Sequence, residues 1–204
     1  MAGELVLLSQ DEARFPLVPT LRTTLGVKGA RPLVGSWDCQ DLVYVVASIN
    51  VVQGKLTTRM VDCAARVRAK TGKSKRRVLQ EAFVRHLRDV ARAYPAERYP
   101  RVIIMLDNAP WHRGSLVAAV LRECPHLEFY RLPSYCPDLN PIERVWKLLR
   151  RRASHNRLFE SMKALRIALR GSLCYFQTCR HRLLSLMGNC KRQRRKSEKN
   201  LSAP

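Results

Sequence analysis

Residues 101–108 read RVIIMLDN, a run of apolar residues that ends abruptly in an acid and an amide. An uninterrupted apolar run of this length predicts a strand over 101–106 that is buried on both faces, as strands of parallel sheets are. Asp107 then stands at the carboxyl end of that strand. Ligand-binding groups of open α/β sheets gather at such strand ends, so Asp107 is a candidate site residue.

The segments on either side of this strand alternate between strand and helix patterns. We predict strands over 4–10, 42–52, 55–62 and 127–132, and helices over 74–93, 114–123, 141–152 and 160–171, with more helix beyond. Residues 12–36 are rich in proline and glycine and are predicted to form a long connection. A first strand, a hairpin and then alternating helices and strands predict an α/β fold, with a mixed β-sheet flanked by α-helices.

The charge of the chain points to a polyanionic partner. Lys and Arg number 38 against 16 Asp and Glu, which gives a net charge of +22 over 204 residues. Nucleic acid is the favoured partner, because basic side chains release counterions from phosphates. Charge alone is also typical of a basic protein that is not an enzyme, such as a ribosomal protein.

The seven cysteines include no Cys-x-x-Cys pair, which disfavours a structural zinc site and favours reduced, mostly buried thiols. The chain shows no signal-peptide pattern and no apolar run long enough to span a membrane. We therefore expect a cytoplasmic protein with no membrane partner.

Three acids form a candidate metal-binding set. Asp11 is predicted to follow the first strand directly, as Asp107 follows its own strand. Glu143 begins a helix within PDLNPIERVW, residues 137–146. The interval from Asp107 to Glu143 is long enough for a helix, a strand and a turn, which can return the chain to the same end of the sheet. Carboxylates are ligands that Mg²⁺ prefers, and a paired metal site suits phosphoryl transfer on a nucleic acid.

Each acid also has a purely structural interpretation. Asp107 could belong to a turn at the strand end, and Glu143 could be the capping-box partner of Asn140 at the start of a helix. Asp11 could be a solvated loop acid. Three other acids could then replace it as the first ligand: Glu12, Asp38 and Asp41.

Longer motifs carry a resemblance to a known family. The segments VIIMLDNAPWHRG (102–114) and LPSYCPDLNPIERVWKLLRRRASHN (132–156) resemble DDE transposases of bacterial insertion sequences related to mariner elements. The segment QDEARFPLVPTLRTTLGVKGARP (10–32) is similar to the family's first block. The resemblance covers about residues 5–170, and departs from the family at Leu25 and Cys136, where Trp and Ser are common.

The resemblance implies an RNase H-like fold and a catalytic triad of Asp11, Asp107 and Glu143 that binds two Mg²⁺ or Mn²⁺ ions. It further implies that Asn108 and His112 lie near the site. His112 is interpreted either as a structural hydrogen-bonding residue or as a DNA contact. Trp146 is interpreted as a core residue, because it shares a helical face with Ile142 and Leu149.

The implied function is DNA cleavage at element ends and strand transfer into target DNA, a cut-and-paste reaction at TA dinucleotides. The expected partners are DNA, further copies of the chain, and an N-terminal helix-turn-helix segment supplied by fusion or by a separate protein. The expected setting is the bacterial nucleoid. We expect the catalytic domain over 1–172, followed by a helical extension and a basic, mobile tail over 173–204. Two alternatives are an RNase H-type nuclease and an inactive, DNA-binding remnant of a transposase.

Overall fold

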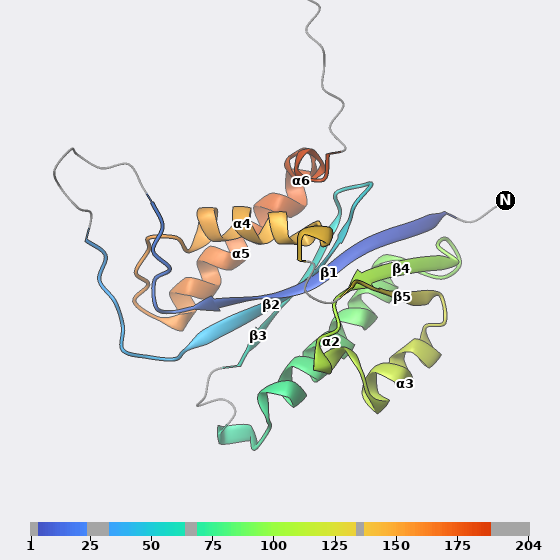
Figure 1. Ribbon diagram of the computed structural model, residues 1–204, viewed down its shortest axis with the longest axis horizontal. Coiled ribbons are helices and arrows are strands. Elements are labelled where there is room, and N and C mark those ends of the chain that lie inside the picture. Colours follow the sequence, from blue (N-terminus) through green and yellow to red (C-terminus); the bar gives the residue numbers. More distant parts are fainter. Residues whose placement is uncertain (1–3, 24–32, 64–68, 134–136, 189–204) are drawn as a thin grey trace, which may run out of the picture.

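The core of the protein is a mixed five-stranded sheet with helices on both faces (Figure 1). The computed structural model describes residues 4–23, 33–63, 69–133 and 137–188. The strand order is β3-β2-β1-β4-β5. The strands are β1 (Leu5–Pro16), β2 (Leu42–Asn50), β3 (Leu56–Asp62), β4 (Arg101–Leu106) and β5 (Leu127–Arg131). The helices are α2 (Lys75–Ala93), α3 (Ser115–Glu123), α4 (Ile142–Ala153), α5 (Met162–Thr178) and α6 (Arg180–Leu186), with short 3-10 turns η1 (Pro110–His112) and η2 (Pro137–Leu139).

The central strand β1 has different neighbours along its length. It pairs antiparallel with β2 as far as Pro16 opposite Leu42. Its parallel pairing with β4 ends earlier, at Ser9 opposite Met105. From Asp11 onward, β1 therefore has β2 on one side and no partner strand on the other among the strands that the structure describes. This step in the sheet creates a local edge beside the end of β4.

Alternate residues of β1 enter two separate cores. Val6 and Leu8 pack in a cluster with residues of α2 and α3. Ala13 and Phe15 pack on the opposite face with residues of α4, α5 and α6. Because side chains of a strand alternate between faces, Glu12 points towards α2 while Asp11 points towards α4. Figure 1 shows the two groups of helices on either side of the sheet.

The predicted helix over 74–93 is confirmed as α2. The Ser74 side chain accepts a hydrogen bond from the backbone N–H of Arg77, which caps the first turn. Leu79, Phe83 and Leu87 follow at helical spacing and are completely buried. This apolar stripe fixes α2 against the sheet, while its basic residues face outward.

The first strand differs from the prediction, because it continues to Pro16 rather than ending at residue 10. Asp11 consequently lies within β1, so the prediction that it follows the strand was wrong. The polar run did not end the strand because the backbone remains paired with β2, where Asp11 stands opposite Ala47. The side chains of Gln10 and Glu12 also find buried hydrogen-bond partners, which lowers the cost of burying them.

Two smaller predictions also need correction. In β4, Ile103 and Met105 are only partly buried, so this strand is less enclosed than its apolar sequence indicates. Helix α5 runs through the expected boundary at residue 172 to Thr178. Leu173 of α5 and Leu183 of α6 belong to the same core as β1 and β2. The first residues of the predicted extension therefore pack on the sheet domain.

Five cysteines lie in the described residues, all as thiols: Cys39, Cys63, Cys124, Cys174 and Cys179. Only Cys63 of these is buried, so the expectation of mostly buried thiols was wrong. Leu25, Cys136 and the predicted basic tail over 191–199 lie outside the described residues. Within the described ranges, no helix combines the length and apolar character that crossing a membrane requires.

Candidate active site

Asp11 is held on the α4 face of the sheet. The indole Nε1 of Trp146 donates a hydrogen bond of 2.9 Å to its Oδ2. Trp146 is buried in the core, as predicted, and so fixes the orientation of the carboxylate. Burial raises the pKa of Asp11 to about 7, with repulsion from the carboxylates of Glu12 and Glu143 adding to the effect. The charged form of Asp11 is therefore short of compensating positive charge.

Asp107 lies at the end of the neighbouring strand. The last aligned pair of β1 and β4 is Ser9 with Met105, and two residues further along each chain stand Asp11 and Asp107. Oδ1 of Asp107 accepts a hydrogen bond from the backbone N–H of Ala109, at 2.9 Å, and lies 3.0 Å from Nδ1 of His112, which also donates to the Asp107 carbonyl at 3.3 Å. The contact with His112 lowers the pKa of Asp107, so this acid is ionised at neutral pH. Its side chain remains 54% exposed and accessible to a ligand.

Glu143 is brought to β1 by Asn140. The Asn140 side chain donates a 3.0 Å hydrogen bond to the carbonyl of Gln10 and accepts one from the hydroxyl of Ser9. The Ser9 hydroxyl in turn accepts a 3.1 Å hydrogen bond from the backbone N–H of Ile142. These buried contacts fasten the start of α4 to β1 immediately before Asp11.

The capping-box interpretation of Glu143 does not describe this helix. Its N-cap position is Pro141, which provides no side-chain hydrogen bond. Asn140 uses its side chain on β1 instead. Within the described part of the chain, the Glu143 carboxylate forms no hydrogen bond or ion pair, so it is available to a ligand.

The three carboxylates have the chemistry to bind a divalent cation, although they do not lie close enough together to form a metal site as they stand. Among the residues that the structure describes, no three Asp, Glu, His or Cys side chains lie close enough together to hold a metal ion. Asp11 nevertheless feels the negative charge of Glu143, and Trp146 occupies only one oxygen of Asp11. The contacts of Asp107 likewise fall on one oxygen, Oδ1. Unused carboxylate oxygens and uncompensated negative charge are what a hard divalent cation requires.

Glu12, which is buried on the α2 face of the sheet, supports Asp107 through His112. Glu12 accepts hydrogen bonds from Nε1 of Trp111 at 2.9 Å, from Nε2 of His112 at 3.1 Å and from the Gln10 side chain at 2.7 Å. The side chains of His112 and Glu12 are 0% and 3% exposed. His112 thus joins Glu12 to Asp107 through its two ring nitrogens.

This arrangement bears on the two interpretations of His112. Its complete burial favours the structural hydrogen-bonding role over a contact with DNA. Burial alone would lower the pKa of His112, but the carboxylates of Glu12 and Asp107 outweigh it and raise the pKa to about 9. The imidazole is therefore charged at neutral pH, and both of its nitrogens are donors.

The sequence did not reveal the contribution of Glu12, because a strand residue that alternates with Asp11 looks like a solvated acid. As an alternative first ligand, Glu12 points to the wrong face and is already fully engaged. Asp38 is exposed, and Asp41 lies past the end of β1, where its carbonyl accepts a hydrogen bond from the Leu17 N–H. Asp11 is the acid of this region that faces Trp146 and Glu143.

Asn108, also expected near the site, connects the ends of two strands. Its side-chain amide donates a 2.9 Å hydrogen bond to the carbonyl of Leu132, just after β5. Its Oδ1 accepts a 3.2 Å hydrogen bond from Arg113. These contacts hold the turn after Asp107 in place.

The pKa of His112 leads to a testable dependence of stability on pH. An unfolded histidine has a pKa near 6.5, and the folded value is about 9. The stabilisation is therefore complete below pH 6.5 and is lost as the pH rises through about 9. Urea unfolding across this range should show that fall, and Glu12→Gln should diminish it. An unchanged free energy of unfolding up to pH 10, roughly one unit beyond that pKa, would contradict a charged His112.

The family to which the chain belongs follows from a match over most of its length. The family model of DDE superfamily endonucleases matches residues 6–166, and the chain belongs to this family. Its sheet, flanked by helices on both faces, is RNase H-like, which confirms the expected fold class.

Solved structures of the Mos1 mariner transposase have the same fold. A Mos1 paired-end complex with Mn superposes with a TM-score of 0.59 at 17% identity, over 90% of this chain and 54% of that one. A pre-cleavage Mos1 transpososome gives 0.61 at 17% identity, over 90% and 54%. The Mos1 catalytic domain gives 0.55 at 16% identity, over 89% of this chain and 78% of that chain.

A sequence relative is the uncharacterized protein y4pE/y4sA of Sinorhizobium fredii (strain NBRC 101917 / NGR234). It is 31% identical over 80 residues, which are 39% of this chain and 55% of the relative. The matched region thus covers 55% of this relative, and the chain spans about half the length of the Mos1 chains in the paired-end and pre-cleavage complexes.

Proposed function

We propose that this chain is the catalytic domain of a transposase that cuts DNA at the ends of a mobile element and joins them to target DNA. Asp11, Asp107 and Glu143 are its catalytic carboxylates. The supporting observation is the convergence at the step in the sheet. There, Asp107 directly follows β4, Asp11 lies on the neighbouring strand, and Asn140 fastens the first turn of α4, which carries Glu143.

The three carboxylates would hold two divalent ions, Mg²⁺ or Mn²⁺. Such ions supply the positive charge that activates an attacking hydroxyl and stabilises the leaving oxygen of a phosphodiester. Trp146 keeps Asp11 oriented towards α4, and His112 keeps Asp107 ionised and fixed. Mos1 structures with Mn and with Mg support the choice of metal.

Basic side chains would bring the DNA to this acidic site in the bacterial cytoplasm. The chain carries a net charge of +22, which attracts phosphates over the whole molecule. Water would attack the phosphodiester and release a 3′-hydroxyl. That hydroxyl would then attack a phosphodiester of the target, preferentially at TA, so the second step exchanges one bond for another. A pre-cleavage Mos1 transpososome and a Mos1 strand transfer complex support the two steps.

The deciding experiment compares substrates in parallel. The protein is incubated with labelled duplex carrying candidate inverted repeats from the DNA on either side of its gene, with random duplex and with an RNA–DNA hybrid, each with Mg²⁺, Mn²⁺ or EDTA. Metal-dependent nicking and joining of the repeat DNA is the expected result. Cleavage of the hybrid alone would identify an RNase H-type nuclease. DNA binding with no cleavage in any metal would identify an inactive remnant.

The raised pKa of Asp11 predicts that metal binding depends on pH. With a pKa of about 7, Asp11 is largely protonated one unit below that value and must lose its proton to bind a cation. Calorimetry with Mg²⁺ in buffers of different ionisation enthalpy should detect proton release at about pH 6 and little at about pH 8. Asp11→Asn should remove the difference between the two pH values. Equal proton release at both would contradict the prediction.

A further inference from the structure

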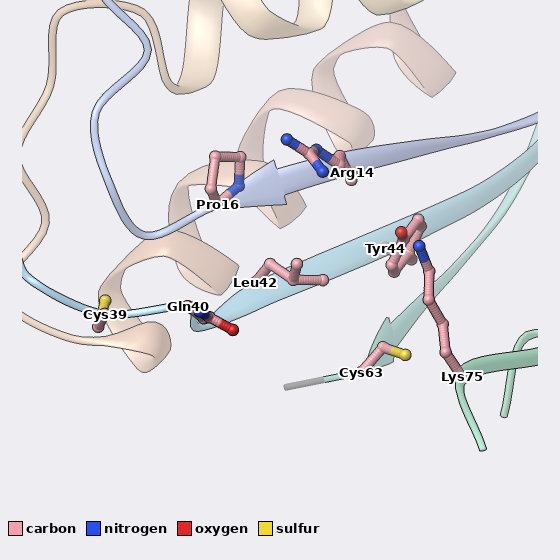
Figure 2. A pocket seen from close by; sticks show the side chains of 8 residues that line it. All are labelled: Arg14, Pro16, Cys39, Gln40, Leu42, Tyr44, Cys63 and Lys75. Atoms are coloured by element: carbon pink, nitrogen blue, oxygen red, sulfur yellow. The ribbon is translucent and has the colours of Figure 1, made fainter. Parts of the chain in front are cut away.

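We propose that a basic pocket on the α2 face of the sheet, across the sheet from Asp11, binds phosphates of the DNA backbone. The pocket has a volume of about 330 Å³ and lies where β1 ends and β2 begins (Figure 2). This inference rests on the proposed function, since it takes DNA as the ligand. It adds a defined contact to the diffuse attraction of the basic surface.

The lining of the pocket selects for an anion. Arg14 of β1 and Lys75 at the start of α2 contribute two positive charges, and none of the described residues that line the cavity is a carboxylate. Arg14 stands directly opposite Tyr44 in the β1–β2 register, so the two side chains share a face. Lys75 extends from α2 towards Tyr44, and its Nζ lies 5.4 Å from the centre of that ring (Figure 2).

These two cations differ from many of the basic residues around them. On α2 and its surroundings, positive charges are commonly neutralised by nearby acids, as in Arg77 with Glu81 and Arg88 with Glu123. Within the described ranges, neither Arg14 nor Lys75 forms an ion pair with an acid. Two uncompensated cations in a partly enclosed cavity are a stronger attraction for a phosphate than the same charges on an open surface.

The position of the pocket fits a strand of DNA that passes the acids. Arg14 is three residues beyond Asp11, which is about 10 Å along the strand at ~3.3 Å per residue. That distance corresponds to about three base steps along a B-form duplex at ~3.4 Å each. This part of β1 lies along the local edge left by the end of β4. Arg14 lies on the α2 face and Asp11 on the α4 face, so DNA that contacts both would have to pass across this edge.

The test measures DNA binding in EDTA, so that cleavage plays no part. Binding of fluorescein-labelled random duplex is followed by anisotropy over a range of KCl concentrations. The double variant Arg14→Gln/Lys75→Gln is expected to bind about tenfold or more weakly, because even one charge-assisted hydrogen bond is worth about that factor. The slope of log K against log salt should fall by about one or two phosphate equivalents of ~0.9 each.

A matched control removes the same charge elsewhere. Arg98 and Arg122 are exposed and lie towards the far end of α2 and on α3, away from the pocket. The variant Arg98→Gln/Arg122→Gln should lose much less affinity and leave the slope nearly unchanged. Arg14→Lys/Lys75→Arg keeps both charges and should recover most of the binding. Thermal unfolding of every variant confirms that the proteins compared are folded.

The outcomes separate the pocket from the proposed function. If the wild-type chain binds duplex and the pocket variant behaves like the control variant, the pocket assignment is overturned while the function stands. If the wild-type chain does not bind duplex, both fail. A selective loss in the pocket variant, restored by the charge-preserving exchange, supports the pocket even where no cleavage is detected.

Discussion

Asp107→Asn is expected to abolish metal-dependent DNA cleavage, with a rate at least about 10³-fold below that of the wild-type chain. The amide matches the carboxylate in shape but lacks the charge that holds a divalent ion. Losing several kcal/mol of transition-state stabilisation corresponds to a factor of this size. The amide oxygen can still accept the hydrogen bond from Ala109, but the variant removes one of the two carboxylates beside the buried His112, so thermal unfolding is needed to confirm that it is folded. The measurement is cleavage of end-labelled duplex in Mg²⁺ and in Mn²⁺.

Asp138→Asn is a suitable control, because Asp138 is an exposed acid in η2, close to Glu143 in sequence. It should cut at the wild-type rate. Binding of the Asp107 variant to DNA in EDTA should be preserved, since affinity comes from distributed cations. If Asp107→Asn cleaves like the control, Asp107 is not a metal ligand and the proposed triad fails.

Glu12→Gln is expected to lower the free energy of unfolding by about 3 kcal/mol, because it leaves the buried charge of His112 without one of its two carboxylates. The amide can replace only part of the hydrogen bonding that Glu12 provides to Trp111, His112 and Gln10. Removing one partner of a buried pair exposes the full desolvation cost of the other. Urea unfolding at neutral pH measures the difference.

The matched comparison is Glu123→Gln, which breaks the exposed ion pair with Arg88. That variant should lose only about 0–1 kcal/mol, as surface pairs do. Similar stability of the two variants would show that the Glu12–His112 contact contributes no more than a surface pair. Glu12→Gln should also weaken cleavage through a less well-fixed Asp107, whereas Glu123→Gln should not.

The sequence predicted the layered fold well, because its signals were local. The apolar run of β4 and the helical stripe of α2 each identify an element without reference to the rest of the chain. The extent of β1 was not predictable in this way. Its polar second half is a strand only because β2, which lies far along the chain, pairs with it.

The same contrast between local signals and distant partners applies to the residues of the candidate site. Asp107 and Glu143 could be identified from their positions next to a strand and at a helix start. The roles of Ser9, Asn140 and Glu12 depend on partners about a hundred residues or more away in sequence. Nothing in their immediate neighbours distinguishes them from solvated polar residues. The presence of an Asp-Glu pair was visible, but its division between two faces of a sheet required the register of β1.

That register also restricts how the chain can change over evolutionary time. A shift of β1 by one residue against β2 would turn every one of its side chains to the opposite face. Asp11 would then face α2 and Glu12 would face α4, so the buried histidine pair and the candidate metal ligand would be lost in a single event. Single-residue insertions or deletions within β1 should therefore be rejected, whereas the connection between β1 and β2 can vary in length. Asp11 and Glu12 are neighbours in sequence that point to two different cores, so a change of register cannot affect one without the other.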